Sequence, residues 1–318
     1  MEPLDVYSHI SQNNRRIWGL ILFFPISLLA FVYGVFAFLC LFEDRPFVEA
    51  IQDVNEVCIT FMPAILGICL VLTLLSFWRG DKMMLGFSGA EVCPNDKEHL
   101  QIYRAVENLA LKAGVPTPKV YVIPDDSLNA FATGYSPKSA SIALTRGIIN
   151  RLEPIELDAV ISHEMAHIIN RDIRLNLFVV TGIGIIGMAG DFLIRMRSSN
   201  SNSNNRNGGS GVFVLIGLCL LLFSYLIAPF IRMALSRTQE FQADAVGSYL
   251  TRHPGALANA LKKISVDPRV ESLDTSPQMA GVCIYNPLKH IGGLLDSHPP
   301  IAERVKRLNK MVGMFGEK

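Results

Sequence analysis

The sequence predicts a mainly α-helical membrane protein of the α+β class, in which four hydrophobic helices accompany a domain with a small β-sheet. Two observations indicate this class. Half of the 318 residues are hydrophobic, 18% are charged and the mean hydropathy is +0.32, which is too apolar for an ordinary soluble domain. The apolar residues gather in four long runs, and a stretch with helix and strand periodicity separates the second run from the third.

Charge and cysteine content exclude several classes of protein. The net formal charge is +1 and the isoelectric point is near 7.7, so no excess of positive charge attracts nucleic acid, and no nucleic-acid partner is expected. The six cysteines include no C-x-x-C pair, which argues against a disulfide-stabilised scaffold. The high apolar content disfavours a fully soluble enzyme.

The first pair of runs predicts a two-span membrane hairpin within residues 1–80. Ile17–Phe42 and Val57–Trp78 carry no charged residue, and each is long enough for a helix to cross a bilayer, which takes roughly 20 residues. Glu43–Glu56 lies between them and is expected to be a tight, mostly acidic loop. Because no small-residue cleavage site closes the first run, we interpret it as an uncleaved anchor rather than a signal peptide.

Basic residues on both sides of this hairpin predict its orientation. Arg15 and Arg16 precede the first run, and Arg79 and Lys82 follow the second. Positively charged residues near membrane helices are enriched on the cytoplasmic side. The N-terminus and the chain after Trp78 are therefore expected to face the cytoplasm.

Residues 176–231 contain two further hydrophobic runs, Leu177–Ile194 and Val212–Ile231, which are separated by a Ser/Asn-rich stretch at 195–211. This composition predicts a flexible loop. The loop also carries arginines, which the same charge rule would hold in the cytoplasm, against two complete crossings. The sequence therefore leaves open whether this pair spans the bilayer or lies partly against it.

Residues 81–175 have the pattern of the first part of a globular domain. We expect a helix that opens at Asn95, with Glu98 in a capping-box position, and that ends at Gly114. Two strands are expected to follow, because two short runs there have the composition of strands. A second helix is expected after them, because a proline stands at a typical first helical position. These three elements are Lys119–Ile123, Ser139–Leu144 and Pro154–Asn170.

The second predicted helix contains the H-E-x-x-H pattern His163-Glu164-Met165-Ala166-His167. Two histidines four residues apart lie one turn apart on the same helix face, so both can bind one metal ion. Neutral imidazoles suit Zn²⁺, which in catalytic sites takes three protein ligands and one water molecule. Glu164 can reach that water as a general base. We therefore expect one zinc ion per chain, with His163 and His167 as ligands.

The third ligand is expected in residues 232–318, on a helix predicted for Arg237–Leu250. Glu240 and Asp244 lie four residues apart on one face of this helix. We interpret Glu240 as the third zinc ligand and Asp244 as the carboxylate that holds the other ring nitrogen of a ligand histidine. The alternative is a solvated acidic helix face.

Several segments, in this order along nearly the whole chain, match one known family. They are AGVPTPKVY at 113–121, NAFATG at 129–134, ELDAV at 156–160, HEMAHIINRD at 163–172, EFQAD at 240–244, and SHPP at 297–300 with Arg304. In these segments the chain resembles the HtpX-type membrane metalloproteases, which are relatives of the CAAX prenyl proteases. The resemblance implies a gluzincin-like zinc metalloprotease domain beside the four hydrophobic helices.

The same resemblance implies a membrane-bound, zinc-dependent endopeptidase of the bacterial cell inner membrane, multi-pass, with its active site facing the cytoplasm. Such an enzyme hydrolyses misfolded or damaged membrane and cytoplasmic proteins in quality control and the stress response, without ATP. The implied partners are unfolded or membrane-embedded protein substrates and the lipid bilayer, with no nucleotide. The implied zinc ligands are His163, His167 and Glu240, and Glu164 is the implied catalytic acid and base.

Two further assignments concern the substrate. The segment with Asn129, Ala130 and Phe131 is expected to form a cleft wall, together with the strand that follows it, where an edge strand pairs with an extended substrate. His298 and Arg304 either stabilise the oxyanion of the tetrahedral intermediate or form a buried structural pair.

Two alternative functions stay open at this point. A prenyl-protein-type processing protease would use the same chemistry on a lipidated substrate, although such relatives generally have more than the four spans visible here. A catalytically inactive zinc-binding membrane scaffold would not need a carboxylate beside its first ligand, and Glu164 supplies one.

Overall fold

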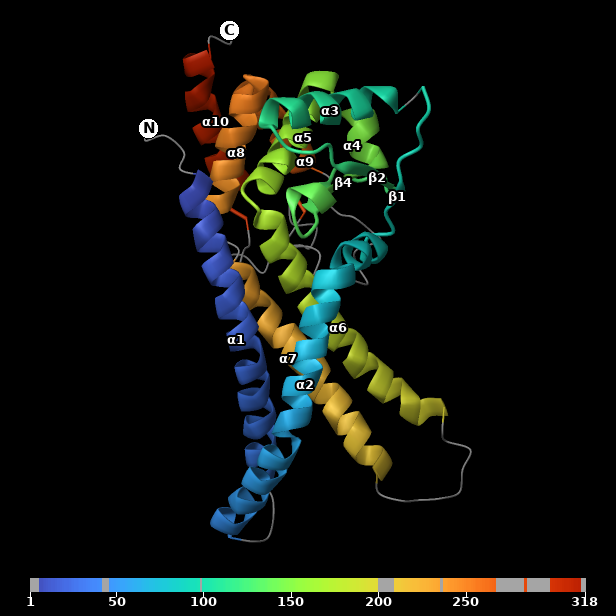
Figure 1. The fold of residues 1–318 in the computed structure, drawn as a ribbon, viewed down its shortest axis with the longest axis vertical. Helices are drawn as coiled ribbons and strands as arrows, with labels where there is room; N and C mark the ends of the chain where they lie inside the picture. The colour runs from blue at the N-terminus through green and yellow to red at the C-terminus, as the bar shows by residue number, and fades with distance from the viewer. Residues whose placement is uncertain are drawn as a thin grey trace. The chain divides into compact units, whose positions relative to one another are not determined.

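The computed structural model describes residues 6–41, 46–97, 99–199, 209–234, 237–266, 283–284 and 298–315. These residues form mostly helices and one small mixed sheet, which confirms the predicted mainly α, α+β class (Figure 1). The chain divides into two compact units. The first unit comprises Met1–Asn14, Arg79–Thr181 and Pro229–Lys318, and the second comprises Arg15–Trp78 and Gly182–Ala228.

The four hydrophobic runs lie in long helices, except that the first of these helices ends at Cys40, and Phe42, at the end of the first run, lies outside the described residues. These helices are α1 (Val6–Cys40), α2 (Phe47–Phe87), α6 (Asp172–Ser199) and α7 (Gly209–Ala234). The expected loop at Glu43–Glu56 is wrong for most of its length, because α2 begins at Phe47. Pro46 precedes this helix, and its carbonyl accepts a hydrogen bond from the Glu49 N–H. Glu49 lies in the first turn, where its negative charge interacts favourably with the helix dipole. Part of the expected loop at 195–211 is helical too, and residues 200–208 lie outside the described residues.

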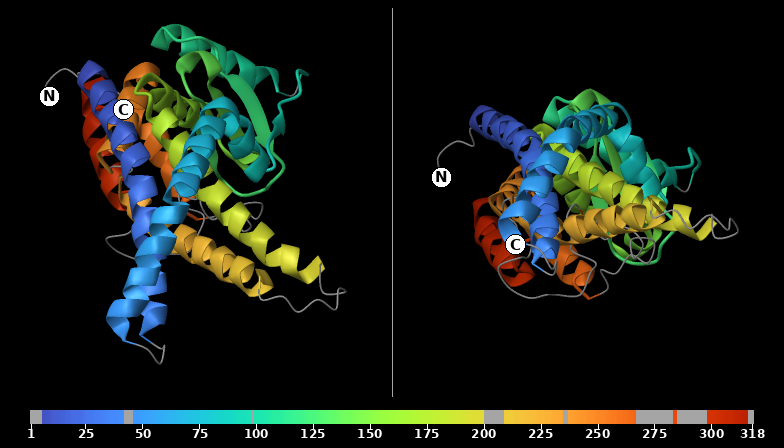
Figure 2. Two further views of the ribbon diagram at one scale, coloured as in Figure 1. Left: turned by 60° about the horizontal axis from the view of Figure 1, so that its bottom comes forward. Right: turned by 90° about the horizontal axis from the view of Figure 1, so that it is seen from below.

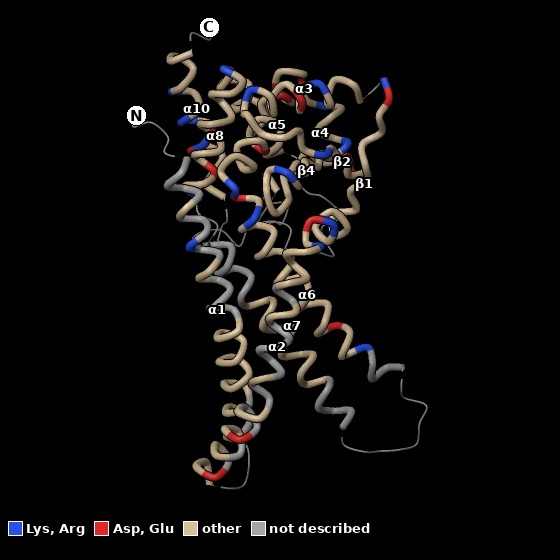
Figure 3. Tube along the Cα trace, viewed as in Figure 1, with Lys and Arg blue, Asp and Glu red and all other residues tan. Residues whose placement is uncertain are grey.

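The described residues contain one helix that is long and apolar enough to cross a membrane, Asp172–Arg195. Pro25–Val35 and Val214–Leu226 are shorter apolar helical segments. The sequence of α7 contains one charged residue, Arg232, near its end, whereas Figure 3 shows that acidic and basic residues are frequent in the elements of the first unit. Four membrane-spanning helices therefore stay a prediction, while the four long helices are observed.

Within the second unit, α6 and α7 cross at two glycines. A Cβ atom on Gly190 would lie 2.8 Å from the carbonyl oxygen of Gly217, and a Cβ on Gly217 would lie 2.8 Å from that of Gly190. Close backbone approach at small residues is typical of helices that pack in membranes. The Ser224 hydroxyl adds a hydrogen bond to the Ile183 carbonyl at 3.2 Å. Neither glycine can carry a side chain without separating the two helices.

Four strands form the sheet in the first unit, in the order β1-β2-β4-β3. β2 and β4 are parallel, and the outer strands pair with them antiparallel, so β3 lies at one edge. The strands are β1 (Glu91–Val92), β2 (Lys119–Ile123), β3 (Ala130–Thr133) and β4 (Ser141–Thr145). β2 agrees with the predicted strand, the second predicted strand begins two residues later than expected, and β1 and β3 were not predicted as strands.

Both faces of the sheet are buried by alternating side chains. Ala130 and Ile142 belong to the larger hydrophobic cluster, which includes residues of the helices α3 (Leu100–Ala113) and α5 (Pro154–Ile169). Phe131 and Ala143 point to the other face, where they meet residues from the end of α2 and the start of α6. The sheet is therefore fixed from both sides, and its edge strand has little freedom to move.

α5 lies at the centre of the first unit. It contacts β3, α3 and the two helices that follow the hydrophobic runs, α8 (Arg237–Thr251) and α9 (Pro254–Ile264) (Figures 1 and 2). The last helix, α10 (Ile301–Phe315), packs against α8 and α9. The short helices Pro137–Ser139 and α4 (Arg146–Arg151) flank β4.

The start of α3 corrects the predicted capping box. The helix begins at Leu100 rather than at Asn95, and the Asp96 carboxylate accepts a hydrogen bond from the His99 N–H at 2.9 Å. Asp96 thus accepts a hydrogen bond from a backbone N–H at the helix start, a role that the sequence pattern predicted for Asn95 and Glu98. Glu98 itself lies outside the described residues. The helix ends before Gly114, as predicted.

The glycine crossing generates a prediction for the second unit. Gly190→Ala places a methyl group against the Gly217 carbonyl and is expected to lower the free energy of unfolding by about 1–3 kcal/mol. Gly182→Ala, in the same helix with no atom within 4 Å of the added Cβ, is the matched control. Thermal unfolding in detergent measures both, and equal Tm values for the two variants would contradict the close crossing.

Candidate metal centre

α5 carries both histidines of the H-E-x-x-H pattern on one face. Pro154 occupies the first turn, and the Glu153 and Glu156 side chains form a capping box at the start of the helix, which confirms the predicted N-terminus. One turn separates His163 from His167, and their Nε2 atoms lie 3.3 Å apart. Both side chains are buried, so their rings are held by packing.

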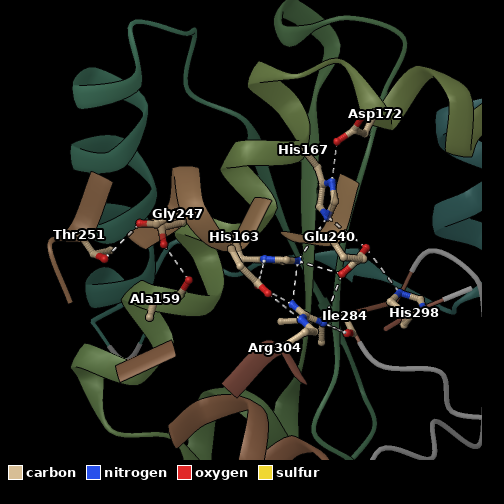
Figure 4. Close-up of polar contacts among 12 residues, drawn as sticks. Ala159, His163, His167, Asp172, Glu240, Gly247, Thr251, Ile284, His298 and Arg304 are labelled. Atoms are coloured by element: carbon tan, nitrogen blue, oxygen red, sulfur yellow. Dashed lines mark hydrogen bonds and ion pairs between the residues drawn. The ribbon is translucent and has the colours of Figure 1, made fainter. Parts of the chain in front are cut away.

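α8 brings the third candidate ligand to the histidine pair. The Glu240 carboxylate lies 3.6 Å from the Nε2 atom of His163 and 3.7 Å from that of His167 (Figure 4). One possible ligand atom from each of these three residues lies within 4.8 Å of the others. The structure therefore brings together the three residues that the sequence predicts as zinc ligands.

Each histidine turns its other ring nitrogen toward a carboxylate. His167 Nδ1 forms a hydrogen bond with Asp172 Oδ2 at 2.9 Å, which leaves its Nε2 lone pair for a metal. His163 Nδ1 lies 3.1 Å from Asp244 Oδ1, within ion-pair distance but outside the angular range of a hydrogen bond. The predicted carboxylate thus faces His163, and a second one, which sequence analysis missed, holds His167.

Arg304 connects α10 to this cluster from a fully buried position. Its Nε and Nη2 atoms donate to the two oxygens of Asp244 at 2.9 and 2.7 Å. Its Nη1 donates to the Ile284 carbonyl at 3.1 Å and lies 3.2 Å from Glu240 Oε2. Nη2 also lies 3.4 Å from His163 Nε2, so all three nitrogens of the guanidinium have partners.

His298 lies beside the same carboxylate. Its Nε2 atom is 3.7 Å from Glu240 Oε1, and the side chain is nearly buried. Burial, together with the nearby positive charge of Arg304, lowers the pKa of His298 despite the opposing effect of Glu240. The structure therefore brings His298 and Arg304, the two residues with open roles, to the predicted ligand Glu240.

The charges at this centre favour a dication. The carboxylates of Glu164, Asp172, Glu240 and Asp244 are buried or nearly so, and Arg304 pairs with two of them, Glu240 and Asp244. Buried carboxylates are costly unless a cation compensates them. Zinc would offset most of the remaining negative charge.

The distances between the candidate ligand atoms also fit zinc. Zn–N bonds of about 2.0–2.1 Å in a tetrahedron put two ligand atoms about 3.4 Å apart. The Nε2 atoms of His163 and His167 lie 3.3 Å apart, and each has a different Glu240 oxygen nearby, Oε2 at 3.6 Å from His163 and Oε1 at 3.7 Å from His167. Glu240 Oε2 is moreover a buried oxygen without a hydrogen bond. The number and type of these ligand atoms, and their approach to within 4.8 Å of one another, therefore suit a zinc ion.

The pKa values of the ligands reflect the same charges. Burial alone would raise the pKa of Glu240, but His298, Arg304 and the ligand histidines hold it well below its usual value. Burial alone would lower the pKa of His167, but the hydrogen bond to Asp172 and the charge of Glu240 raise it to about 9. Glu240 is therefore an anion, and the surroundings of His167 strongly favour positive charge.

The predicted cleft wall is buried and partly paired. Asn129, Ala130 and Phe131 are each at most 1% exposed. The Asn129 carbonyl accepts a hydrogen bond from the Thr145 N–H on the β4 side, so the Ala130 backbone points away from β4. The Ala130 carbonyl accepts a bond from the Ile284 N–H at 2.8 Å. The outer edge of β3 is therefore already occupied at Ala130 by a later part of the chain.

Asp172 and Ile284 are the residues of this centre that sequence analysis missed. Asp172 follows the end of α5, where Arg171 adopts a left-handed conformation with φ of 59° and redirects the chain. The available signal was an acidic residue five positions after the second histidine and two after Asn170, where the predicted helix ends. Ile284 contributes only backbone atoms, and side-chain patterns give no signal for such a role.

The family model and the curated relatives agree on one family. A family model described as Peptidase family M48 matches residues 96–312. The chain is 34% identical to "Protease HtpX homolog" of Dictyoglomus thermophilum, over 98% of this chain and 96% of the relative. It is 32% identical to the protein of the same name from Bacteroides fragilis, over 98% of this chain and all of the relative. A solved structure, the crystal structure of S. mikatae Ste24p, aligns with a TM-score of 0.41 and 19% identity over 96% of this chain and 67% of that chain.

The bond between Asp172 and His167 generates a prediction for metal binding. Asp172→Asn keeps the shape but removes the negative charge that orients the ring, so zinc affinity is expected to fall about 10- to 100-fold. Asp158→Asn, at an exposed position of α5, is the matched control. Competition with a chromophoric chelator measures both affinities. Wild-type affinity in Asp172→Asn would show that the ring does not need this carboxylate.

Proposed function

The chain belongs to peptidase family M48, and we propose that it hydrolyses internal peptide bonds at the centre formed by His163, Glu164, His167 and Glu240. The family confirms the resemblance seen in the sequence, and with it a membrane zinc metalloendopeptidase. The observation that carries the assignment of residues is the approach of two histidine nitrogens and one carboxylate within 4.8 Å. In this proposal, His163, His167 and Glu240 hold one zinc ion per chain.

The proposed mechanism is general acid and base catalysis by Glu164. Zinc held by the three ligands supplies the positive charge that polarises the substrate carbonyl and acidifies a water molecule. Glu164 takes a proton from the attacking water, whose oxygen bonds to the carbonyl carbon. Glu164 then delivers that proton to the amine nitrogen as the carbon–nitrogen bond breaks. Burial raises the pKa of Glu164, although the two histidines oppose this effect, and a raised pKa suits a carboxyl that carries a proton between steps.

We assign different roles to Arg304 and His298. All three nitrogens of Arg304 are engaged with Asp244, Glu240, Ile284 and His163, so we propose that Arg304 holds the ligands in place rather than binding an oxyanion. His298 has its Nε2 atom at the edge of the ligand set, 3.7 Å from Glu240. We propose that this imidazole stabilises the developing oxyanion.

The substrate is proposed to bind as an extended strand along the outer edge of β3. Asn129, Ala130 and Phe131 belong to this wall through their backbone rather than through exposed side chains. The Ile284 N–H already makes the kind of bond to Ala130 that a substrate amide would make, which supports the suitability of this edge for strand addition. A substrate that pairs with Ala130 takes the place of Ile284.

Binding through the backbone accepts many sequences, and this supports a broad substrate class. We propose that the substrates are misfolded or damaged proteins of the membrane and cytoplasm, which expose extended segments, and that their hydrolysis needs no ATP. The role in quality control and the stress response follows from the family resemblance rather than from the geometry of the centre. Nucleic acids and nucleotides are not among the proposed partners.

We further propose a multi-pass location in the bacterial inner membrane with the metal centre facing the cytoplasm. In this arrangement, residues 1–80 and 176–231 form two membrane hairpins, and residues 81–175 and 232–318 form the protease domain. The basic residues Arg15, Arg16, Arg79 and Lys82 at both ends of the first hairpin support the orientation. The bacterial origin of the relatives supports the choice of membrane.

Casein cleavage by the detergent-purified chain tests the catalytic proposal. The wild type is expected to cut, to stop cutting when zinc is chelated and to resume when zinc is returned. Glu164→Gln is expected to bind zinc like the wild type and to cut at least about 100-fold more slowly, because it cannot accept a proton. If both proteins bind zinc and neither cuts unfolded or membrane substrates, the assignment of the peptidase centre to these residues fails.

Reporter fusions test the orientation. Green fluorescent protein fused after the C-terminus is expected to fluoresce in bacterial cells, because this end is proposed to lie in the cytoplasm. Alkaline phosphatase inserted at Pro46 is expected to be active, because the turn of the first hairpin is proposed to lie outside. The reverse pattern, with a dark C-terminal fusion and an inactive phosphatase, would invert the proposed topology.

A further inference from the structure

The contact between α8 and α5 contains a glycine that the mechanism does not use. Glu240, Asp244 and Gly247 follow one another at helical spacing, four and then three residues apart, and so share one face of α8. Glu240 and Asp244 reach the side chain of His163 from this face. Gly247, one turn further along α8 than Asp244, meets the backbone of His163.

The space at Gly247 is closed by main-chain atoms. An ideal Cβ at this position would lie 3.0 Å from the backbone nitrogen of His163 and 3.1 Å from its Cα. The carbonyl carbon of Ser162 lies 3.1 Å away as well. A flexible side chain could turn aside, but the backbone of a buried helix cannot, so any side chain at position 247 moves α8 away from α5 by a few tenths of an ångström.

A movement of this size matters to a metal centre. Bonds from zinc to its ligands hold to within about 0.2 Å of their usual lengths. The Glu240 oxygens Oε2 and Oε1 are already 3.6 Å from His163 Nε2 and 3.7 Å from His167 Nε2 respectively, and each distance is slightly beyond the ideal tetrahedral spacing of about 3.4 Å. A further separation of the helices takes the third ligand out of range of an ion that the two histidines hold.

We propose that Gly247 is a positioning residue for the metal centre, because its missing side chain sets the approach of α8 to α5 and thereby the distance of Glu240 from His163 and His167. This inference rests on the proposed role of these three residues as zinc ligands. Nothing in the mechanism requires Gly247 to touch the substrate, so its effect passes entirely through the position of Glu240 and Asp244.

The direction of the effect of a Gly→Ala substitution distinguishes a positioning glycine from an unconstrained one. Glycine in the middle of a helix is ordinarily less favourable than alanine by about 0.5–1 kcal/mol, so Gly→Ala at an unconstrained position stabilises a helix. Gly313, in α10, is such a position, because it is exposed and its Cβ would meet no atom within 4 Å. Gly313→Ala is therefore the matched control for Gly247→Ala.

The experiment uses the full-length protein in detergent and does not depend on activity alone. Zinc affinity is measured by chelator competition, ligand geometry by the visible absorption of the Co²⁺-substituted protein, and folding by Tm with and without zinc. Gly247→Ala is expected to fold, to bind zinc about 10-fold more weakly and to show an altered Co²⁺ spectrum, with a smaller rise in Tm on zinc addition. Its kcat is expected to fall while KM changes little. Gly313→Ala is expected to match the wild type in zinc affinity, spectrum and kcat.

Each other result overturns the inference in a recognisable way. Wild-type zinc affinity and Co²⁺ spectrum in Gly247→Ala would show that the centre does not depend on this contact. A Gly247→Ala chain that folds neither with nor without zinc would make the glycine a requirement of the fold instead. Failure of the underlying functional proposal would give a different result. In that case the wild type would bind no zinc, or the zinc that it binds would still bind to His163→Ala.

Discussion

The crossing of α5 and α8 is the contact on which the rest of the metal centre depends. Neither helix carries a complete ligand set, and an isolated pair of histidines on α5 would leave the third position to solvent. The crossing brings Glu240 to both histidines and Asp244 to His163, at distances of 3.1–3.7 Å. It also buries several carboxylates, which raises their energy unless cations compensate them. Arg304 compensates part of this charge from α10, so the assembly of three helices and the binding of a dication reinforce each other.

In the proposed function, the small sheet has a comparable role in binding the substrate. Its side chains alternate into two hydrophobic clusters, so the strand order and the register of β3 are fixed from both faces. The same alternation along the backbone turns the Ala130 carbonyl away from β4 and toward Ile284. The Ile284 carbonyl in turn is bonded to Arg304, which also contacts Glu240. The edge strand is therefore connected to the metal ligand Glu240 through the Ile284 backbone and the Arg304 guanidinium.

The sequence predicted those parts of the centre that depend on local spacing. His163 and His167 follow from the helical repeat, and Glu240 follows from the acidic residues of a second helix once a metal is expected. Asp172 could not be predicted in this way, because the left-handed turn at Arg171 lies between it and α5. β3 gave little strand signal, since its small alanines lack the β-branched side chains that favour strands, and its formation depends on packing from both faces. The role of Arg304 depends on its burial against residues far away in the sequence, which the spacing of residues along the chain does not predict.

The position of Asp172 links the metal centre to the hydrophobic helices by the chain itself. Asp172 is the first residue of α6, and the segment from Asp172 to Arg195 is long and apolar enough to cross a membrane. The carboxylate that orients His167 thus begins the same helix that would enter the bilayer. His167 and Glu240 both belong to one centre, so the intervening chain must return to the side from which it left, and α6 and α7 together cross the membrane either twice or not at all.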